Sequence, residues 1–222
     1  MDAKLQHLLA ILDSADLRPW PQEKIEWRPK DWDKNPHAPL IAEAYGQLGG
    51  TGNYREIHPG QWDILISGHA IALDDALHFN RYRKTTLRSP LYDKLPDFPL
   101  NQYRRYIQQY ENECLKAGSH GDHWSHREAL RHFAAAEAPG ELYGPGSPAW
   151  KYLAIQEMMK DAIALHRGHA HVHIPVYDTL LVSGKMVSVK QVLSSRQSGM
   201  EAFMLAWLSR KLPQSLQQKD GE

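Results

Sequence analysis

Apolar residues recur every three or four positions in several stretches of the chain, and this spacing predicts amphipathic helices. The stretch with the clearest ends runs from 149 to 166, because Ser147-Pro148 is a typical helix start and Gly168 a typical stop. Ser125 and Glu128 form a capping-box pattern, which predicts another start. The expected helices are 2–14, 38–48, 100–116, 125–136, 149–166 and a terminal helix after Ser198.

Other stretches alternate apolar and polar residues or are short apolar runs between turn residues, which predicts strands. Pro59-Gly60 and Ser67-Gly68 are turn signals that separate three of them. Ser-Gly-Lys at 183–185 predicts a hairpin between two more. The expected strands are 53–58, 61–67, 69–75 and 169–177, with a hairpin of 180–182 and 186–189.

This order of elements predicts an α/β fold of the mixed α+β kind, with a small mixed sheet. The chain is expected to begin with a helix and a Pro- and Trp-rich extension, residues 1–36. A core at 37–177 follows, with a helical insertion at about 90–148, and a hairpin and a helix at 178–222 end the chain. In the core a helix precedes three strands, and a further helix and strand follow the insertion.

The composition narrows the class of protein. The 222 residues include 26 Lys plus Arg and 26 Asp plus Glu, so the chain as a whole is not a basic nucleic-acid coat, although local basic clusters remain. A single cysteine, Cys114, excludes an intramolecular disulfide and fits a reducing compartment. No apolar run is long enough to span a bilayer. These features predict a cytoplasmic protein without a membrane partner.

Carboxylates gather at the ends of two expected strands. Asp63 lies at the start of the second strand and Asp74 at the end of the third. Because alternate strand residues share a face, Ala72 and Asp74 point the same way, and pairing in a hairpin sets Asp63 beside them. Converging carboxylates are typical ligands of Mg²⁺, which activates water for attack on a phosphodiester. The simpler alternative is that Asp74 and Asp75 only end the strand.

Asp63, the segment Ala72-Leu73-Asp74 and His78 together resemble the site of the PD-(D/E)XK nuclease superfamily, in particular its very-short-patch-repair-like branch. That branch has an Asp on one strand, Glu-x-Asp on the next and a His four residues later. The superfamily core has the order αβββαβ, which the elements expected at 37–177 supply. The resemblance implies a restriction-endonuclease-like fold and an endonuclease that cuts DNA with Mg²⁺ or Mn²⁺. It implies metal ligands Asp63 and Asp74, a His78 that orients water or phosphate, and a setting in DNA repair, restriction or phage defence.

The chain departs from that pattern at Ala72, which occupies the position of the metal-binding Glu and offers no oxygen. Three explanations are open. The protein is a natural relative that binds without catalysis, or the Glu was removed by design, or its role has passed to Asp74, Asp75 or Glu43.

The lysine of the superfamily is also missing from the strand. Lys151 and Lys160, on the helix expected at 149–166, are the candidate substitutes, and Lys151 is the one assigned to catalysis. A place at the surface or in the first turn of the helix explains each lysine more simply.

A basic stretch follows the acidic strand end, and more cations open the next expected helix. Cations beside metal-binding carboxylates suit a phosphate backbone, and neighbouring tyrosines supply rings for stacking. The alternative is a solvated basic face. The expected DNA-binding residues are Arg81, Arg83, Lys84, Arg88, Arg104 and Arg105.

Two histidine clusters offer a different metal chemistry, because imidazoles are zinc ligands. Histidines on one strand project in parallel, however, so a partly exposed sheet face and a polar loop are the simpler explanations. The clusters are His166, His169, His171 and His173, and His120, Asp122, His123 and His126. Cys114 lies on the apolar face of its helix and is expected to be a buried, inert thiol.

The sequence therefore predicts a nuclease-fold protein that acts on DNA by metal-dependent phosphodiester hydrolysis, inactive in this form if Ala72 marks a lost ligand. One alternative is a non-catalytic module of the same fold that binds nucleic acid, a protein partner or a second copy of itself. A zinc-dependent hydrolase built on the histidines is the other.

Overall fold

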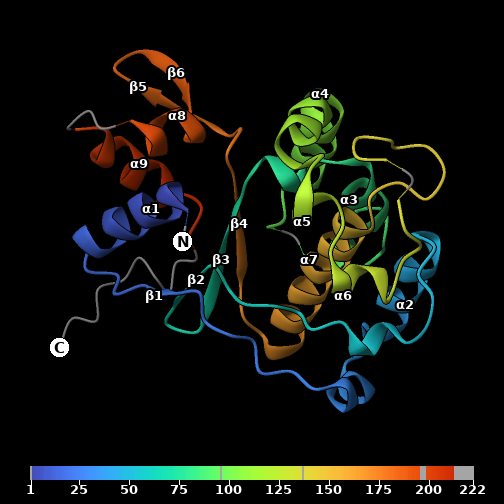
Figure 1. Cartoon of the computed structure of the whole chain (residues 1–222). Coiled ribbons are helices and arrows are strands. Elements are labelled where there is room, and N and C mark those ends of the chain that lie inside the picture. Colours follow the sequence, from blue (N-terminus) through green and yellow to red (C-terminus); the bar gives the residue numbers. More distant parts are fainter. Residues whose placement is uncertain (1, 96, 137, 196–198, 213–222) are drawn as a thin grey trace. The chain divides into compact units, whose positions relative to one another are not determined.

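The computed structural model describes residues 2–95, 97–136, 138–195 and 199–212. The chain is a mixed α/β protein with a small mixed four-stranded sheet and a separate two-stranded sheet (Figure 1). It forms two compact units, which interleave along the sequence instead of following one another as consecutive segments. Unit 1 comprises the described residues of 1–24, 61–74 and 169–222, and unit 2 those of 25–60 and 75–168.

The four-stranded sheet belongs to unit 1 and has the order β1-β2-β3-β4. Its strands are β1 (Trp20–Pro21), β2 (Ile64–Ile66), β3 (His69–Asp74) and β4 (His171–Pro175). β1 and β3 are antiparallel to β2, whereas β4 is parallel to β3. The expected hairpin of the second and third predicted strands and the expected small mixed sheet are therefore confirmed, and the strand near 169–177 belongs to that sheet.

The β2–β3 hairpin follows from its turn residues. Ser67 and Gly68 both have positive φ, 46° and 80°. Two consecutive residues of this kind match the right-handed twist of the flanking strands, and glycine adopts the conformation without strain. Ile64 and Ile66 are buried, so the register of the hairpin is set by burial as well as by the turn.

The predicted strand at 53–58 is wrong. Tyr54–Glu56 forms a short 3-10 helix, because the side chain of Asn53 accepts a hydrogen bond from the N–H of Arg55 at 3.1 Å and turns the backbone. The additional strand of the sheet is β1, where Trp20 pairs with Leu65. This strand comes from the Pro- and Trp-rich extension, so it precedes the helix at 38–47 in the chain instead of following it.

The rest of unit 1 is a small helical layer with the two-stranded sheet. α1 contacts α8 and α9, and α9 contacts β5 (Figure 1). The predicted hairpin is confirmed, but α8 was not predicted. These elements are α1 (Ala3–Ser14), β5 (Thr179–Val182), β6 (Lys185–Ser188), α8 (Val189–Ser194) and α9 (Met200–Leu208). Ser198, the expected start of the terminal helix, lies outside the described residues.

Unit 2 is built around α7 (Pro148–Arg167), which α2, α3, α5 and α6 contact (Figure 1). Both predicted ends of α7 are confirmed. Ser147 Oγ accepts a hydrogen bond from the N–H of Trp150 at 3.2 Å, and Gly168 ends the helix with φ of 69°. The other helices are α2 (Ala38–Gln47), α3 (Arg81–Thr86), α4 (Leu100–Gly118), α5 (Gly121–Trp124) and α6 (Arg127–Leu130), with 3-10 helices at Pro29–Lys34, Ala76–His78 and Tyr92–Lys94.

The helix expected at 125–136 is shorter than predicted, and its cap lies one residue later, at His126 instead of Ser125. Ser125 is the extended residue that ends α5, and its N–H donates to Gly121 O. His126 is the cap of α6, because its Nδ1 accepts from the N–H of Ala129 at 3.2 Å.

α4 and α7 have 19 and 20 residues. Within the described ranges, neither these two nor any other helix combines the length and the apolar character that crossing a membrane requires.

Candidate functional site

One face of the four-stranded sheet carries acidic and imidazole groups of unit 1. In the β3–β4 register Ala72 pairs with His173. Extending the β2–β3 register by one position from the Ile64–Ile71 pair sets Asp63 opposite Ala72. Residues that pair across strands share a face. Ala72 and His173 therefore share one face, and Asp63 comes directly before β2, one position beyond the Ile64–Ile71 pair of the hairpin.

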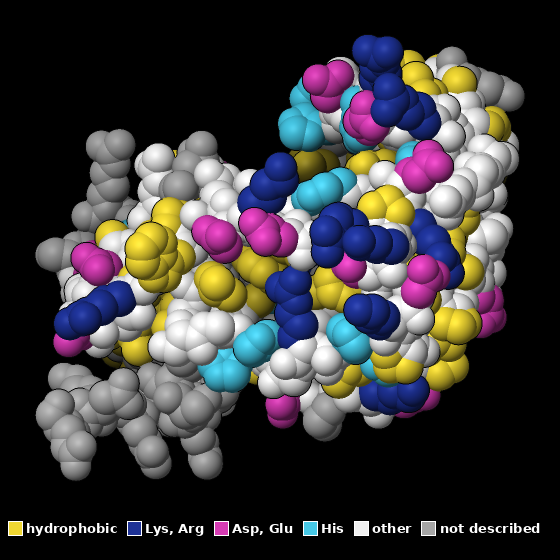
Figure 2. All heavy atoms as spheres, turned by 90° about the horizontal axis from the view of Figure 1, so that it is seen from below, with side chains coloured by type: hydrophobic (Ala, Val, Ile, Leu, Met, Phe, Trp, Pro, Cys, Tyr) yellow, Lys and Arg dark blue, Asp and Glu magenta, His cyan; other side chains and the backbone are white. Residues whose placement is uncertain are grey.

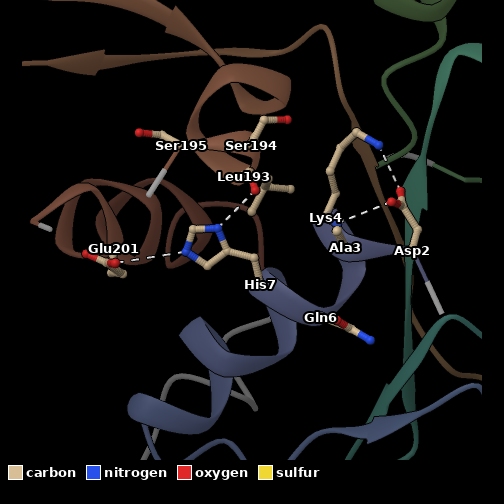
Figure 3. A pocket seen from close by; sticks show the side chains of 9 residues that line it. All are labelled: Asp2, Ala3, Lys4, Gln6, His7, Leu193, Ser194, Ser195 and Glu201. Atoms are coloured by element: carbon tan, nitrogen blue, oxygen red, sulfur yellow. Dashed lines mark hydrogen bonds and ion pairs between the residues drawn. The ribbon is translucent and has the colours of Figure 1, made fainter. Parts of the chain in front are cut away.

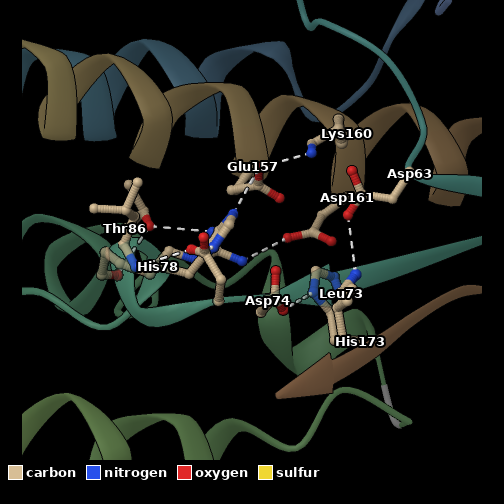
Figure 4. A network of polar contacts seen from close by, with 12 residues as sticks. Asp63, Leu73, Asp74, His78, Thr86, Glu157, Lys160, Asp161 and His173 are labelled. Carbon is tan, nitrogen blue, oxygen red and sulfur yellow. Dashed lines mark hydrogen bonds and ion pairs between the residues drawn. The ribbon is translucent and has the colours of Figure 1, made fainter. Parts of the chain in front are cut away.

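Two more polar residues lie on this face because they are two positions away along the same strands. Asp74 follows Ala72 on β3, and its Oδ2 is 2.7 Å from His173 Nδ1 (Figure 4). Asp74 and His173 are both buried. His171 precedes His173 on β4, and the two ring centroids are 4.3 Å apart. The face thus brings together two acids and two histidines, and we call this set, Asp63, Asp74, His171 and His173, the polar sheet face.

Asp63 reaches toward β3 through its side chain. Its Oδ2 accepts a hydrogen bond from the N–H of Leu73 at 2.9 Å (Figure 4). That N–H belongs to the peptide between Ala72 and Leu73, so the Asp63 carboxylate lies against the backbone one residue before Asp74.

The polar sheet face offers both oxygen and nitrogen donors, but no three of its four described residues have ligand atoms that all lie within 4.8 Å of one another. Asp63 and Asp74 bring carboxylate oxygens, and His171 and His173 bring imidazole nitrogens. Position 72 brings no donor atom. Mg²⁺ prefers oxygen ligands, whereas imidazole suits Zn²⁺ and other transition metals.

Unit 2 has a polar cluster of its own. It consists of Asp75 and His78, which directly follow β3, and of Glu157 and Lys160 on α7. Asp75 Oδ1 accepts from the N–H of Leu77 at 2.9 Å and lies 3.0 Å from His78 Nδ1. His78 Nε2 is 3.5 Å from Glu157 Oε1, and Lys160 Nζ is 2.7 Å from the same oxygen (Figure 4). Two carboxylates therefore fix the orientation of the His78 ring.

Both candidate lysines are buried. Lys151 lies in the first turn of α7, which is one of the two places expected for it, whereas Lys160 lies neither at the surface nor in the first turn. Lys160 is paired with Glu157, which sequence reasoning missed, although a three-residue spacing of opposite charges on one helix was a usable signal. Lys151 Nζ lies 5.5 Å from the ring centre of Tyr82 and 5.8 Å from that of Phe133. Burial lowers the pKa of Lys151. These contacts favour a packing role for Lys151.

Arg83 is not placed to bind DNA, contrary to the prediction, because its side chain is buried. One guanidinium nitrogen is 3.1 Å from Asp161 Oδ2, and the other donates to the Tyr92 hydroxyl at 2.6 Å. The Tyr92 hydroxyl donates in turn to Asp161 Oδ2 at 2.8 Å. Burial raises the pKa of Tyr92 well above its ordinary value, which keeps this donor protonated. The three side chains form a closed charged network that joins α3 to α7.

The other cations of the predicted DNA-binding set are more accessible. Arg81 is partly exposed, and its Nε and terminal nitrogen bind Glu111 at 3.0 Å each. Arg88 and Arg105 are exposed, Lys84 and Arg104 half-buried. On the face seen in Figure 2, basic side chains are interspersed with acidic ones and histidines instead of forming one continuous patch.

The histidines of the loop cluster do not converge. His120 and His123 are exposed, and His126 caps α6. Among the described residues, His120, Asp122, His123 and His126 do not form a group of three close ligand atoms. Cys114 is buried as predicted, and burial raises its pKa to about 12, so the thiol is inert at neutral pH.

A cavity of about 590 Å³ in unit 1 lies between the start of α1 and the ends of α8 and α9 that face it (Figure 3). Its polar lining is largely paired with itself. His7 Nδ1 is 3.0 Å from Leu193 O, and His7 Nε2 is 3.9 Å from Glu201 Oε1. Lys4 Nζ is 2.8 Å from Asp2 Oδ2. These pairs hold the helices together and give the cavity no evident chemistry.

The fold defines a mixed α/β protein, and the polar sheet face is its candidate functional site. The chain belongs to DUF7255, a family of unknown function, whose model matches residues 43–195. The matched region includes all of β2, β3, β4 and α7, and so every residue of the polar sheet face. Searches of the curated proteins and of the solved structures found no match to the chain.

Proposed function

We propose that this protein is a nuclease-fold protein that acts on DNA by metal-dependent phosphodiester hydrolysis, with Mg²⁺ or Mn²⁺ held at the polar sheet face. One observation carries the proposal. The Asp63 carboxylate is bonded to the backbone of β3 at Leu73, next to Asp74. Asp63 lies directly before β2 and Asp74 ends β3, and these are the two positions that the resemblance to PD-(D/E)XK nucleases, in its very-short-patch-repair-like branch, assigns to metal ligands.

Each residue has a definite task in this proposal. Asp63 and Asp74 would hold the ion through their carboxylate oxygens, and a bound ion would supply activation of water and stabilisation of phosphate charge. His173 orients Asp74 through the contact of 2.7 Å. His78 follows Asp74 by four residues in the chain, and Asp75 holds its ring so that it can orient a water or a phosphate oxygen.

The DNA backbone would be bound by the cations that remain accessible in unit 2. Exposed cations are favoured because a phosphate contact releases counterions only if the side chain reaches the DNA. Arg83 is therefore removed from the expected set. The proposed residues are Arg81, Lys84, Arg88, Arg104 and Arg105.

A second function, a non-catalytic module that binds nucleic acid or a protein partner, is favoured by Ala72. This residue shares a face with His173 and contributes no ligand. A protein that keeps the fold and lacks one carboxylate binds its target without hydrolysing it.

Cleavage of supercoiled plasmid DNA separates the two functions. We expect Ala72→Glu to nick or cut the plasmid in Mn²⁺, and Ala72→Glu with Asp74→Asn to leave it intact. The matched control is Ala72→Glu with Asp13→Asn, which changes an exposed acid of α1 and should retain cleavage. Activity of the wild-type chain favours the enzyme. DNA binding without cleavage by any variant favours the module, and absence of both contradicts the proposed function.

A further inference from the structure

We propose that Lys151 binds a small oxyanion, a carboxylate or a phosphate group, at the start of α7. Lys151 lies in the first turn of this helix, and all residues that carry the inference belong to unit 2. The inference goes beyond the proposed function, which gives Lys151 no task.

The first argument is that the Lys151 ammonium is buried without a compensating charge. The residue is only 9% exposed, and Nζ forms no hydrogen bond or ion pair with any residue that the structure describes. Its ring contacts are with Tyr82 and Phe133, whose centres lie at 5.5 and 5.8 Å. Ring faces attract a cation but do not neutralise it. Because a buried charge is costly unless it is paired, the site favours an anion taken from solution.

The second buried lysine of α7 shows what Lys151 lacks. Lys160 Nζ is 2.7 Å from Glu157 Oε1, so its charge is compensated on the same helix. Burial lowers the pKa of Lys151, and no acid in the described part of the chain counters this effect. A bound oxyanion would have the same role beside Lys151 that Glu157 has beside Lys160.

The second argument is the position of the ammonium at the start of α7. Long side chains on a helix point toward its N-terminus. Tyr82, whose ring Lys151 contacts, accepts a hydrogen bond at 3.2 Å from the N–H of the cap residue Ser147. The N–H of Ala149, in the first turn, has no acceptor among the described residues. The partial positive charge and the free N–H groups at the start of a helix favour anions, and the lysine adds a full charge.

The third argument is that the ammonium lies close to the surface although its side chain is buried. Nζ is 4.0 Å from the position that a Cβ would occupy at Gly49, an exposed residue just after α2. Gly49 has no side chain, so this approach stays open. A small anion can therefore reach Nζ, whereas the backbone of a duplex is too bulky to contact a buried side chain.

Isothermal titration calorimetry of the full chain with sodium phosphate or sodium acetate, each against sodium chloride of equal ionic strength, tests this assignment. Lys151→Met keeps an unbranched apolar stem and removes the charge, and Lys151→Gln is a second neutral variant. The matched control is Lys116→Met, which removes an exposed lysine of α4. Circular dichroism and melting curves verify that each variant is folded.

We expect the wild type to bind one phosphate or acetate ion per chain. Lys151→Met and Lys151→Gln should each weaken this binding by about tenfold or more, whereas Lys116→Met should not change it. Tighter binding of phosphate would identify a phosphate group as the ligand, and tighter binding of acetate a carboxylate. In chloride alone, Lys151→Met should melt no lower than the wild type, because an apolar group replaces an uncompensated buried charge.

The assignment is overturned if neither anion binds the wild type, or if a folded Lys151→Met or Lys151→Gln variant binds both anions as the wild type does. Absence of anion binding together with a lower melting temperature of Lys151→Met would leave Lys151 a packing role alone. A short DNA duplex is titrated as a further arm. Displacement of bound phosphate by the duplex would assign the ammonium to the DNA backbone and contradict a site for small oxyanions.

Discussion

The guanidinium of Arg83 is the most buried cation of the basic stretch, and its surroundings are polar. Asp161 and Tyr92 satisfy it at 3.1 and 2.6 Å. A buried ion pair adds little compared with a well-packed apolar pair, but removal of one partner leaves an uncompensated charge. The residue therefore matters more for the stability of unit 2 than for binding.

We expect Arg83→Ala to lower the free energy of unfolding by about 3–5 kcal/mol. Urea unfolding followed by circular dichroism measures this loss. Arg88→Ala, which truncates an exposed arginine two residues after α3, is the control and should change the free energy by about 0.5 kcal/mol or less. Equal stability of the two variants would show that Arg83 does not hold α3 to α7.

His132 gives a pH dependence. It is buried with its Nδ1 3.2 Å from the Tyr45 hydroxyl, and burial lowers its pKa below the ordinary 6.5. The unfolded chain then binds more protons than the folded chain between the lowered pKa and 6.5. The free energy of unfolding should therefore fall as the pH falls through this window, and the full stability is present only above 6.5.

His132→Asn keeps a polar group near Nδ1 but cannot titrate, so the variant should lose less stability between pH 7 and pH 5 than the wild type. Some loss will remain, because burial also lowers the pKa of His37 and His69. Urea midpoints at several pH values measure the effect, with exposed His120→Asn as control. Parallel curves for the wild type and His132→Asn would contradict the assignment.

At the scale of elements, the sequence predicts what local signals determine. α7 has a serine cap, a proline at its first position and a glycine stop, and the β2–β3 turn has the required Ser-Gly. β1 could not be found, because a two-residue strand is defined only by its partner β2. The strand expected at 53–58 failed because one Asn side chain turned the backbone. α3 and α8, with six residues each, are too short for a periodic pattern.

The residues of the candidate site also fall into two groups: those whose placement local patterns predict, and those whose contacts depend on pairing between distant parts of the chain. Alternation along the strands was enough to place Asp74 and Ala72 on one face and to associate Asp63 with them. The contact of Asp74 with His173 joins residues 99 positions apart, and it needs the parallel β3–β4 register, which no local pattern contains. Burial of Arg83 likewise depends on Asp161, 78 residues away.

The basic side chains of α3 and α4 and the segment between them support a prediction about DNA. Arg88→Ala and Arg105→Ala should each weaken binding of a DNA duplex, and each lost phosphate contact should reduce the slope of log K against log salt by about 0.9. Fluorescence anisotropy at several salt concentrations measures both effects.

Arg127→Ala is the matched control, because this arginine is exposed at the start of α6. It should leave the salt dependence unchanged. If Arg88→Ala and Arg105→Ala behave as Arg127→Ala does, these arginines lie outside any nucleic-acid surface.

At the scale of the whole molecule, the charges balance, so affinity for DNA has to come from a local surface. The chain passes between its two units after residues 24, 60, 74 and 168. One passage separates Asp74 of unit 1 from Asp75 of unit 2. The proposed metal ligand and the acid that holds His78 are therefore consecutive residues, and the segment matched by DUF7255 spans this passage.

The central claim, a divalent-metal site formed around Asp63, Ala72 and Asp74, is tested most directly by melting curves of Ala72→Glu and its neutral match Ala72→Gln with Mg²⁺, Mn²⁺ or a chelator. The new carboxylate should add a third acidic ligand for Mg²⁺ beside Asp63 and Asp74. Without metal, Ala72→Glu should melt lower than Ala72→Gln, because position 72 is buried and clustered carboxylates repel.

An ion that binds only the folded chain stabilises it by about 2.7 kcal/mol at about 100 times Kd. Chains of this length gain about 2–4 °C per kcal/mol. We expect Mg²⁺ and Mn²⁺ to raise the melting temperature of Ala72→Glu by several degrees and that of Ala72→Gln by less. Identical melting of Ala72→Glu in Mg²⁺, Mn²⁺ and chelator would contradict it.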